Sequence, residues 1–167
     1  MQRHFDKVVE FCKKKNVKTV LEIGGIRSLD YNYVVGDGHA TVHWINNFEE
    51  VYSYDIEPRV KELTLFATAY SEKLTAETKD GVLAIKEFPK QIDLLYLDAW
   101  DVIPGTDYKE KHLEAFQAAE EKLHDNSVIL IDDMEHGENG KGGLVIPYAL
   151  TKGWKRMDIG KQAILYK

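Results

Sequence analysis

The sequence has a single cysteine, Cys12, among 167 residues. A lone cysteine excludes an intrachain disulfide and a zinc site built from several cysteines. Cys12 follows Phe5, Val8 and Val9 at helical spacing, so we expect it to pack in the core rather than to react.

Long apolar runs and an excess of positive charge are also absent. No run approaches the about 18 apolar residues that a membrane-spanning helix needs, and the polar N-terminal segment does not resemble a signal peptide. Acidic residues outnumber basic ones by 28 to 22, a net charge of −6, so nothing indicates a surface for nucleic acid or an anionic membrane. We expect a soluble, cytoplasmic protein whose partners include neither nucleic acid nor a membrane.

Two common catalytic motifs are missing as well. The sequence contains neither a G-x-S-x-G elbow nor the Ser-His-Asp order of a catalytic triad, so a serine hydrolase is not expected. Dinucleotide-binding dehydrogenases carry G-x-G-x-x-G at the start of a helix, whereas a long loop follows Gly24-Gly25 here. His39 and His43 have metal-compatible spacing, but their segment offers no third ligand for zinc.

Short apolar runs alternate with amphipathic segments along the chain, of which 44% is hydrophobic. The runs predict strands at residues 17–23, 51–55, 74–78, 92–98 and 127–131, and a closing hairpin of residues 154–157 and 163–166 around Gly160. Helices are predicted at residues 1–15, 39–47, 58–70, 80–88, 107–123 and 146–150, with a mobile glycine-rich loop at residues 137–143. Residues 63–68 also suit a strand, although we favour the helix.

This alternation predicts the fold class. We expect one α/β domain over residues 1–167, with a Rossmann-like, doubly wound sheet of about seven strands. The sheet should be mostly parallel, with an antiparallel strand in its C-terminal hairpin. Ligands bind such sheets at the carboxyl ends of the strands.

The ends of the first two predicted strands suggest what binds there. Gly24 and Gly25 would let a ligand approach the backbone, and Asp55 is placed to accept hydrogen bonds from a ribose. Together they predict a site for a nucleoside cofactor.

The strand-end motifs resemble those of class I S-adenosylmethionine-dependent methyltransferases, most closely the metal-dependent small-molecule O-methyltransferases of the catechol and macrocin type. The resemblance runs from Val17 to Tyr166 and rests on Glu22-Ile23-Gly24, Asp55, Lys79-Asp80-Gly81, Asp98-Ala99-Trp100-Asp101 and Asp132-Asp133. It implies S-adenosylmethionine as cofactor, bound by Glu22, Gly24, Gly25, Thr41, Asp55, Ile56, Asp80, Gly81, Asp98 and Trp100.

Of these expected contacts, that of Thr41 involves a departure from the family pattern, and Trp100 has an alternative role. The step Gly36-Asp37-Gly38-His39-Ala40-Thr41 has alanine where relatives carry serine, so Thr41 is expected to supply the hydroxyl at the amino-acid end of the cofactor. Trp100 can stack on adenine, and it suits core packing equally well.

Acidic residues gather at the ends of the fourth and fifth predicted strands. Several like charges at one site need a cation or a shared proton, and hard oxygen ligands suit Mg²⁺. By the resemblance, the metal ligands are Asp98, Asp132 and Asp133, and the metal would acidify a substrate hydroxyl. The alternative is that Asp98 and Asp132 cap the following loops while Asp133 is solvated.

The resemblance implies transfer of a methyl group from S-adenosylmethionine to a hydroxyl of a small molecule. Asp101 stands where relatives carry a lysine or histidine base, so Asp101 or His136 is expected to remove the hydroxyl proton. The alternative is a protein that binds the cofactor without transferring the methyl group. The chain has no sizeable cap to build a substrate pocket, which leaves open a homo-oligomer whose partner subunit completes it.

Overall fold

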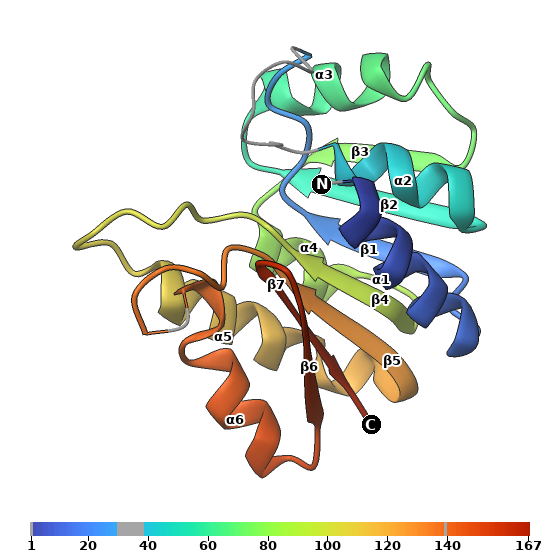
Figure 1. The fold of residues 1–167 in the computed structure, drawn as a ribbon. Helices are drawn as coiled ribbons and strands as arrows, with labels where there is room; N and C mark the ends of the chain where they lie inside the picture. The colour runs from blue at the N-terminus through green and yellow to red at the C-terminus, as the bar shows by residue number, and fades with distance from the viewer. Residues whose placement is uncertain (1, 30–38, 139) are drawn as a thin grey trace.

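The computed structural model describes residues 2–29, 39–138 and 140–167, and strands alternate with helices along them (Figure 1). The strands are β1 (Thr19–Ile23), β2 (Glu50–Asp55), β3 (Leu74–Thr78), β4 (Ile92–Leu97), β5 (Leu123–Ile131), β6 (Lys155–Ile159) and β7 (Gln162–Tyr166). They form one sheet in the order β3-β2-β1-β4-β5-β7-β6.

The first five strands pair in parallel, and β7 runs antiparallel to both β5 and β6. The register places Val20 opposite both Val51 and Leu94, so the carboxyl ends of these strands lie at one edge of the sheet. This arrangement confirms the predicted mostly parallel sheet with an antiparallel C-terminal hairpin.

Helices cover both faces of the sheet (Figure 1). They are α1 (Gln2–Lys14), α2 (Ala40–Asn47), α3 (Pro58–Ala67), α4 (Gly81–Glu87), α5 (Tyr108–Ala119) and α6 (Val145–Thr151), with 3-10 turns η1 (Glu120–Lys122) and η2 (Gly140–Gly142). Helices α1 and α2 pack on one face, and α4, α5 and α6 pack on the other. None of the helices in the described ranges is long and apolar enough to cross a membrane.

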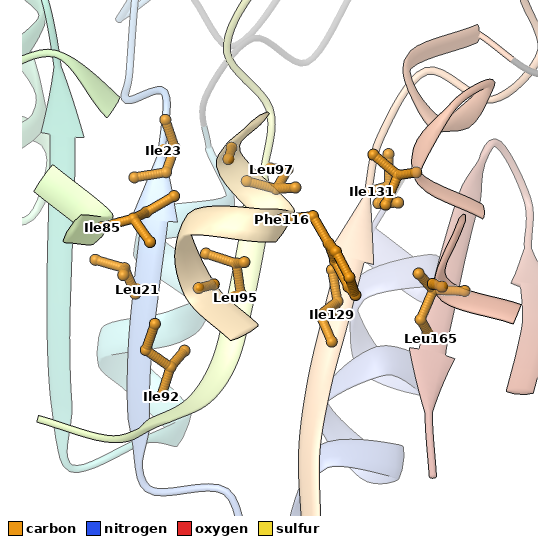
Figure 2. Packing of buried hydrophobic residues seen from close by; sticks show 14 of the residues in the cluster. Leu21, Ile23, Ile85, Ile92, Leu95, Leu97, Phe116, Ile129, Ile131 and Leu165 are labelled. Carbon is orange, nitrogen blue, oxygen red and sulfur yellow. The ribbon is translucent and has the colours of Figure 1, made fainter. Parts of the chain in front are cut away.

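The central strands are apolar because both of their faces are buried. Leu21 and Ile23 of β1 point into the core under α4 and α5, together with Phe116 (Figure 2). Val20 points to the opposite core, where Trp44 of α2 and Cys12 of α1 lie. Cys12 is fully buried, as its spacing predicted, and burial raises the pKa of its thiol to about 12.

Helix α3 confirms the helical interpretation of residues 63–67, but it ends at Ala67 rather than at residue 70, and its buried face differs from the predicted one. Tyr70, expected to face inward, is exposed, whereas Thr64 and Thr68 are buried. The Thr64 hydroxyl accepts a hydrogen bond from the backbone N–H of Ile26 at 2.9 Å, which fixes the turn after β1. One of the two buried threonines, Thr64, therefore holds that turn, whereas the Thr68 hydroxyl donates to carbonyl groups of its own helix.

The C-terminal half differs from expectation at two further places. Strand β5 begins at Leu123, a residue that the helical stripe had included, rather than at Ser127. The glycine-rich segment contains the turn η2, whose three residues are buried, so this part of it packs against the protein.

Candidate functional site

A cavity of about 240 Å³ opens at the carboxyl ends of the parallel strands. The residues that line it come from the last positions of β1 and β2, from the segments that follow β1, β2, β3 and β4, and from the start of α4: Ile23, Gly24, Gly25, Arg27, Tyr54, Asp55, Ile56, Glu57, Asp80, Gly81, Asp98, Ala99, Trp100 and Asp101. It lies where the strand order reverses between β1 and β4, the place where doubly wound sheets bind ligands.

The floor of the cavity depends on Gly24. Its φ of +99° suits glycine, and a Cβ there would lie 2.9 Å from the backbone nitrogen of Ala99. The turn after β1 can therefore approach the turn after β4 closely, and Gly24 and Ala99 both line the cavity there.

Asp55 ends β2 and points toward the turn after β1. One carboxylate oxygen accepts a hydrogen bond from the Glu57 N–H at 2.9 Å, and the other accepts from the Gly25 N–H at 3.3 Å. These amides orient the carboxylate without neutralising it. Its remaining lone pairs can accept hydrogen bonds from two neighbouring hydroxyls.

Asp80 and Trp100 form another side of the cavity. Asp80 caps α4 by accepting a hydrogen bond from the Leu83 N–H at 2.9 Å. The Trp100 ring lies over Gly81, where a Cβ would come within 3.1 Å of it, and meets His112 edge to face at 5.2 Å. Trp100 has a φ of +51°, so this aromatic wall is held in a backbone conformation that side chains rarely adopt.

Glu22 and Thr41, both predicted to bind the cofactor, do not line the cavity. Along β1 the side chains alternate, so Glu22 points away from Ile23 and is fully buried beneath α2. Its carboxylate accepts hydrogen bonds from Thr41 at 2.7 Å and from the Trp44 indole at 3.1 Å. Burial raises the pKa of Glu22 to about 8, against the opposite effect of these hydrogen bonds.

The predicted base Asp101 lies at the cavity but is ion-paired. Both of its oxygens accept hydrogen bonds from the Arg27 guanidinium, at 2.7 and 2.9 Å. Arg27 was not predicted, although it is the first basic residue after the glycine turn. The neighbouring step Gly36-Asp37-Gly38 lies outside the described residues.

The three predicted metal ligands do come together, but a lysine stands among them. The Nζ atom of Lys141 lies 2.9 Å from Asp98 Oδ1, 2.9 Å from Asp133 Oδ2 and 3.2 Å from the Asp98 carbonyl oxygen. The Lys141 side chain is fully buried. The sequence analysis missed this residue, whose only signal is a lysine between glycines, Gly140-Lys141-Gly142.

Further donors occupy the rest of this acidic cluster, which we define as Asp98, Asp132 and Asp133. Lys161 donates to Asp133 at 2.9 Å, and its ammonium lies 3.5 Å from Asp132. Asp132 also accepts hydrogen bonds from Tyr96 at 2.8 Å and from Gln162 at 3.1 Å.

The two lysines affect the pKa values of Asp98 and Asp133 differently. Burial raises the pKa of Asp98 to about 6, because it outweighs the attraction of Lys141. Burial acts on Asp133 in the same direction, but Lys141 and Lys161 together lower the pKa of its carboxyl to about 2. Asp133 is therefore the firmly ionised partner of both lysines.

This arrangement does not fit the predicted magnesium site. A metal ion between Asp98 and Asp133 would need the oxygens that Lys141 already holds, and two like charges cannot share that position. Within the described ranges, the ligand atoms close enough to share an ion belong to a different group, Asp133, Glu135 and His136. His136 itself is exposed and lies outside the cavity.

Comparisons with known proteins identify the fold. No protein-family model matches the chain, and no curated protein sequence matches it. Solved structures do match. A protein described as a caffeoyl-CoA O-methyltransferase from Staphylococcus aureus has a TM-score of 0.67 at 14% identity, over 98% of this chain and 82% of that one.

Two other similar structures act on different acceptors. The N-methyltransferase NodS of Bradyrhizobium japonicum WM9, in complex with S-adenosyl-L-homocysteine, has a TM-score of 0.61 at 14% identity, over 98% of this chain and 83% of that one. An rRNA methylase from Streptococcus thermophilus has a TM-score of 0.61 at 15% identity, over 96% and 94%. At these identities the chain shares the Rossmann-like fold of these methyltransferases.

Proposed function

We propose that this protein is an S-adenosylmethionine-dependent methyltransferase. The observation that carries the proposal is the cavity at the β1–β4 switch point, where a glycine floor faces the amide-oriented carboxylate of Asp55. The ribose hydroxyls would bind Asp55, and the cofactor would lie across Gly24 and Gly25.

The remaining walls suit the two ends of the cofactor. Adenine would lie between Ile56 and the Trp100 ring, with Asp80 and Gly81 at its edge, since aromatic faces stack well on bases. The amino-acid end and its sulfonium would lie near Asp98. Five carboxylates and one basic residue, Arg27, line the cavity, and such a surface favours a ligand that carries positive charge.

Glu22 and Thr41 would support the cofactor indirectly. Their buried hydrogen bond ties β1 to α2 directly behind the glycine turn. Neither side chain needs to touch the ligand in order to fix the backbone that does.

The acceptor in this proposal is a hydroxyl of a small molecule. An O-methyltransferase is among the similar structures, and Asp101 lies at the cavity, where it would accept the hydroxyl proton. Both of its oxygens accept from Arg27, so the substrate hydroxyl would compete with Arg27 for this carboxylate. His136 would need to move toward the cavity to serve in its place.

A second function is favoured by the same ion pair. If Arg27 keeps Asp101 occupied, the protein binds the cofactor without transferring its methyl group. Methyl-transfer assays over catechols, sugars and macrolide-like alcohols separate the two functions, because only the first predicts methylated products.

Isothermal titration with S-adenosylmethionine and S-adenosylhomocysteine tests the cofactor directly. Asp55→Ala should weaken binding by about ten- to hundredfold, because a charge-assisted hydrogen bond contributes about 1.5–3 kcal/mol. Asp125→Asn, at the opposite end of β5, should bind like the wild type. Wild-type protein that binds a nicotinamide dinucleotide but neither of these ligands would refute the proposal.

A further inference from the structure

Lys141 is a buried cation to which the proposed chemistry gives no task. Burying an ammonium group is costly unless carboxylates compensate for it, and Lys141 has two carboxylates at 2.9 Å. These contacts hold its pKa above the ordinary value although burial acts in the opposite direction. The side chain is therefore a charged, built-in component of the acidic cluster.

The backbone around Lys141 is shaped to deliver it to the cluster. The turn η2 folds back on Asp133, and a side chain at Gly140 would overlap the carbonyl group of Asp133. Gly140 and Asp133 have φ values of +48° and +51°, both in the left-handed region. The glycine at 140 adopts this conformation freely and has no side chain to overlap Asp133, whereas Asp133 holds a conformation uncommon for a residue with a side chain. The backbone is therefore shaped to let the lysine reach its carboxylate partner.

The position of Nζ is the one that a shared metal ion would need. It bridges Asp98 at the end of β4 and Asp133 after the end of β5. Lys161 does not substitute for it, because its described contacts are with Asp132 and Asp133 and its side chain is one-third exposed. Asp98 also lines the cofactor cavity, so this cation, together with the Tyr96 hydroxyl that donates to Asp98 at 3.1 Å, orients that carboxylate.

We propose that Lys141 is the resident cation of the acidic cluster and takes the place of a divalent metal. Lys141 acts as a positioning residue that holds the Asp98 carboxylate at the cavity, and methyl transfer here proceeds without a metal ion. The reference to methyl transfer rests on the proposed function, whereas the cation site itself does not.

Manganese titration followed by electron paramagnetic resonance tests this assignment without a cofactor. The proteins are the wild type, Lys141→Met, Lys141→Met with Asp133→Asn, and the control Lys109→Met, which removes a nearby lysine from outside the cluster. Lys141→Met should gain a Mn²⁺ site at least about tenfold tighter than any in the wild type, a difference of ~1.4 kcal/mol. The added Asp133→Asn should abolish it, and Lys109→Met should resemble the wild type.

Thermal unfolding gives a second readout of the same samples. Mn²⁺ should raise the midpoint of Lys141→Met and leave that of the wild type unchanged, because a ligand that binds only the folded state stabilises it. The assignment is overturned if the wild type binds Mn²⁺ in a way that Asp133→Asn or His136→Ala removes. It is also overturned if Lys141→Met gains no site, or remains unfolded with and without the metal.

Separate titrations with S-adenosylhomocysteine distinguish this inference from the proposed function. Wild-type protein should bind that ligand equally well with Mg²⁺ and with EDTA. Absence of ligand binding would refute the methyltransferase proposal and leave the manganese result standing, whereas EDTA-sensitive binding would overturn the role of Lys141.

Discussion

The carboxylates at the two halves of the sheet edge are compensated in different ways. On the β1–β2 side, Asp55 and Asp80 are oriented by backbone N–H groups. On the β5 side, Asp132 and Asp133 are paired with lysines that reach them from η2 and from the turn before β7. Asp98 lies between the two regions and belongs to both.

This difference distinguishes carboxylates that can bind a ligand from carboxylates that are already paired with lysines of the protein. Amides fix the direction of a carboxylate and leave its charge, so the cavity side remains attractive to a cationic or hydroxylated ligand. Lysines cancel the charge, so the cluster side has little left for a metal. Glu22 shows a third solution, since a buried acid without a cation retains its proton near neutral pH.

The largest effect should come from breaking the cluster side. Lys141→Met leaves Asp98 and Asp133 facing each other without their shared cation, and removing one partner of a buried ion pair costs about 3–5 kcal/mol. Lys161→Met should cost less, because its ammonium group is partly solvated. Urea denaturation of both variants measures the difference.

Equal losses in these two variants would contradict the comparison. They would mean that the cluster responds only to its total charge, and that the position of Lys141 between β4 and β5 has no special importance.

The cavity side could be predicted from the sequence because its residues are local to strand ends. An apolar run fixes each strand, and the residues that follow it must lie at the carboxyl edge, where Gly24, Asp55, Asp80 and Asp98 line the cavity. The motif predicts a cofactor contact for Glu22, whereas strand alternation turns its side chain away from Ile23 and from the cavity.

The cluster side could not be predicted in the same way. Lys141 lies 43 residues after Asp98. Its glycine-rich segment has no hydrophobic periodicity, so the sequence does not predict where the Lys141 side chain points. Only the close approach of η2 to Asp133 brings them together. The sequence predicts that these acids lie together and face a cation or share a proton, but that the cation beside Asp98 and Asp133 is a lysine depends on tertiary packing.

A smaller effect should follow from the pH dependence of Glu22. The unfolded chain ionises this group near pH 4.5, whereas the folded protein keeps the proton until about pH 8. Its stabilising contribution is therefore complete below pH 4.5 and is lost as the pH rises to 8, at about 1.4 kcal/mol per pH unit. Between pH 6.5 and 8 the free energy of unfolding should fall by about 2 kcal/mol.

Glu22→Gln should remove this slope, as measured by urea denaturation at four pH values. The window is informative because other strongly shifted groups lie mainly outside it: the pKa of Asp98 is about 6, that of His112, lowered by burial, is about 4, and that of the Cys12 thiol is about 12. If the pH dependence of the unfolding free energy is unchanged in the variant, Glu22 is ionised in the folded protein. Glu22 would then be a charged carboxylate like the acids that line the cavity.

The smallest effect on stability should come from Arg27 and Asp101, the ion pair at the cavity mouth. Their side chains are 40% and 49% exposed, and solvated pairs of this kind contribute about 0–1 kcal/mol. A double-mutant cycle with Arg27→Gln and Asp101→Asn should therefore give a coupling energy below about 1 kcal/mol in urea denaturation. A weak pair opens readily, which would give a substrate hydroxyl access to Asp101 in its proposed role as base. A coupling of about 2 kcal/mol or more would place Asp101 with the lysine-paired acids of the cluster, and would favour a protein that binds its cofactor without using it.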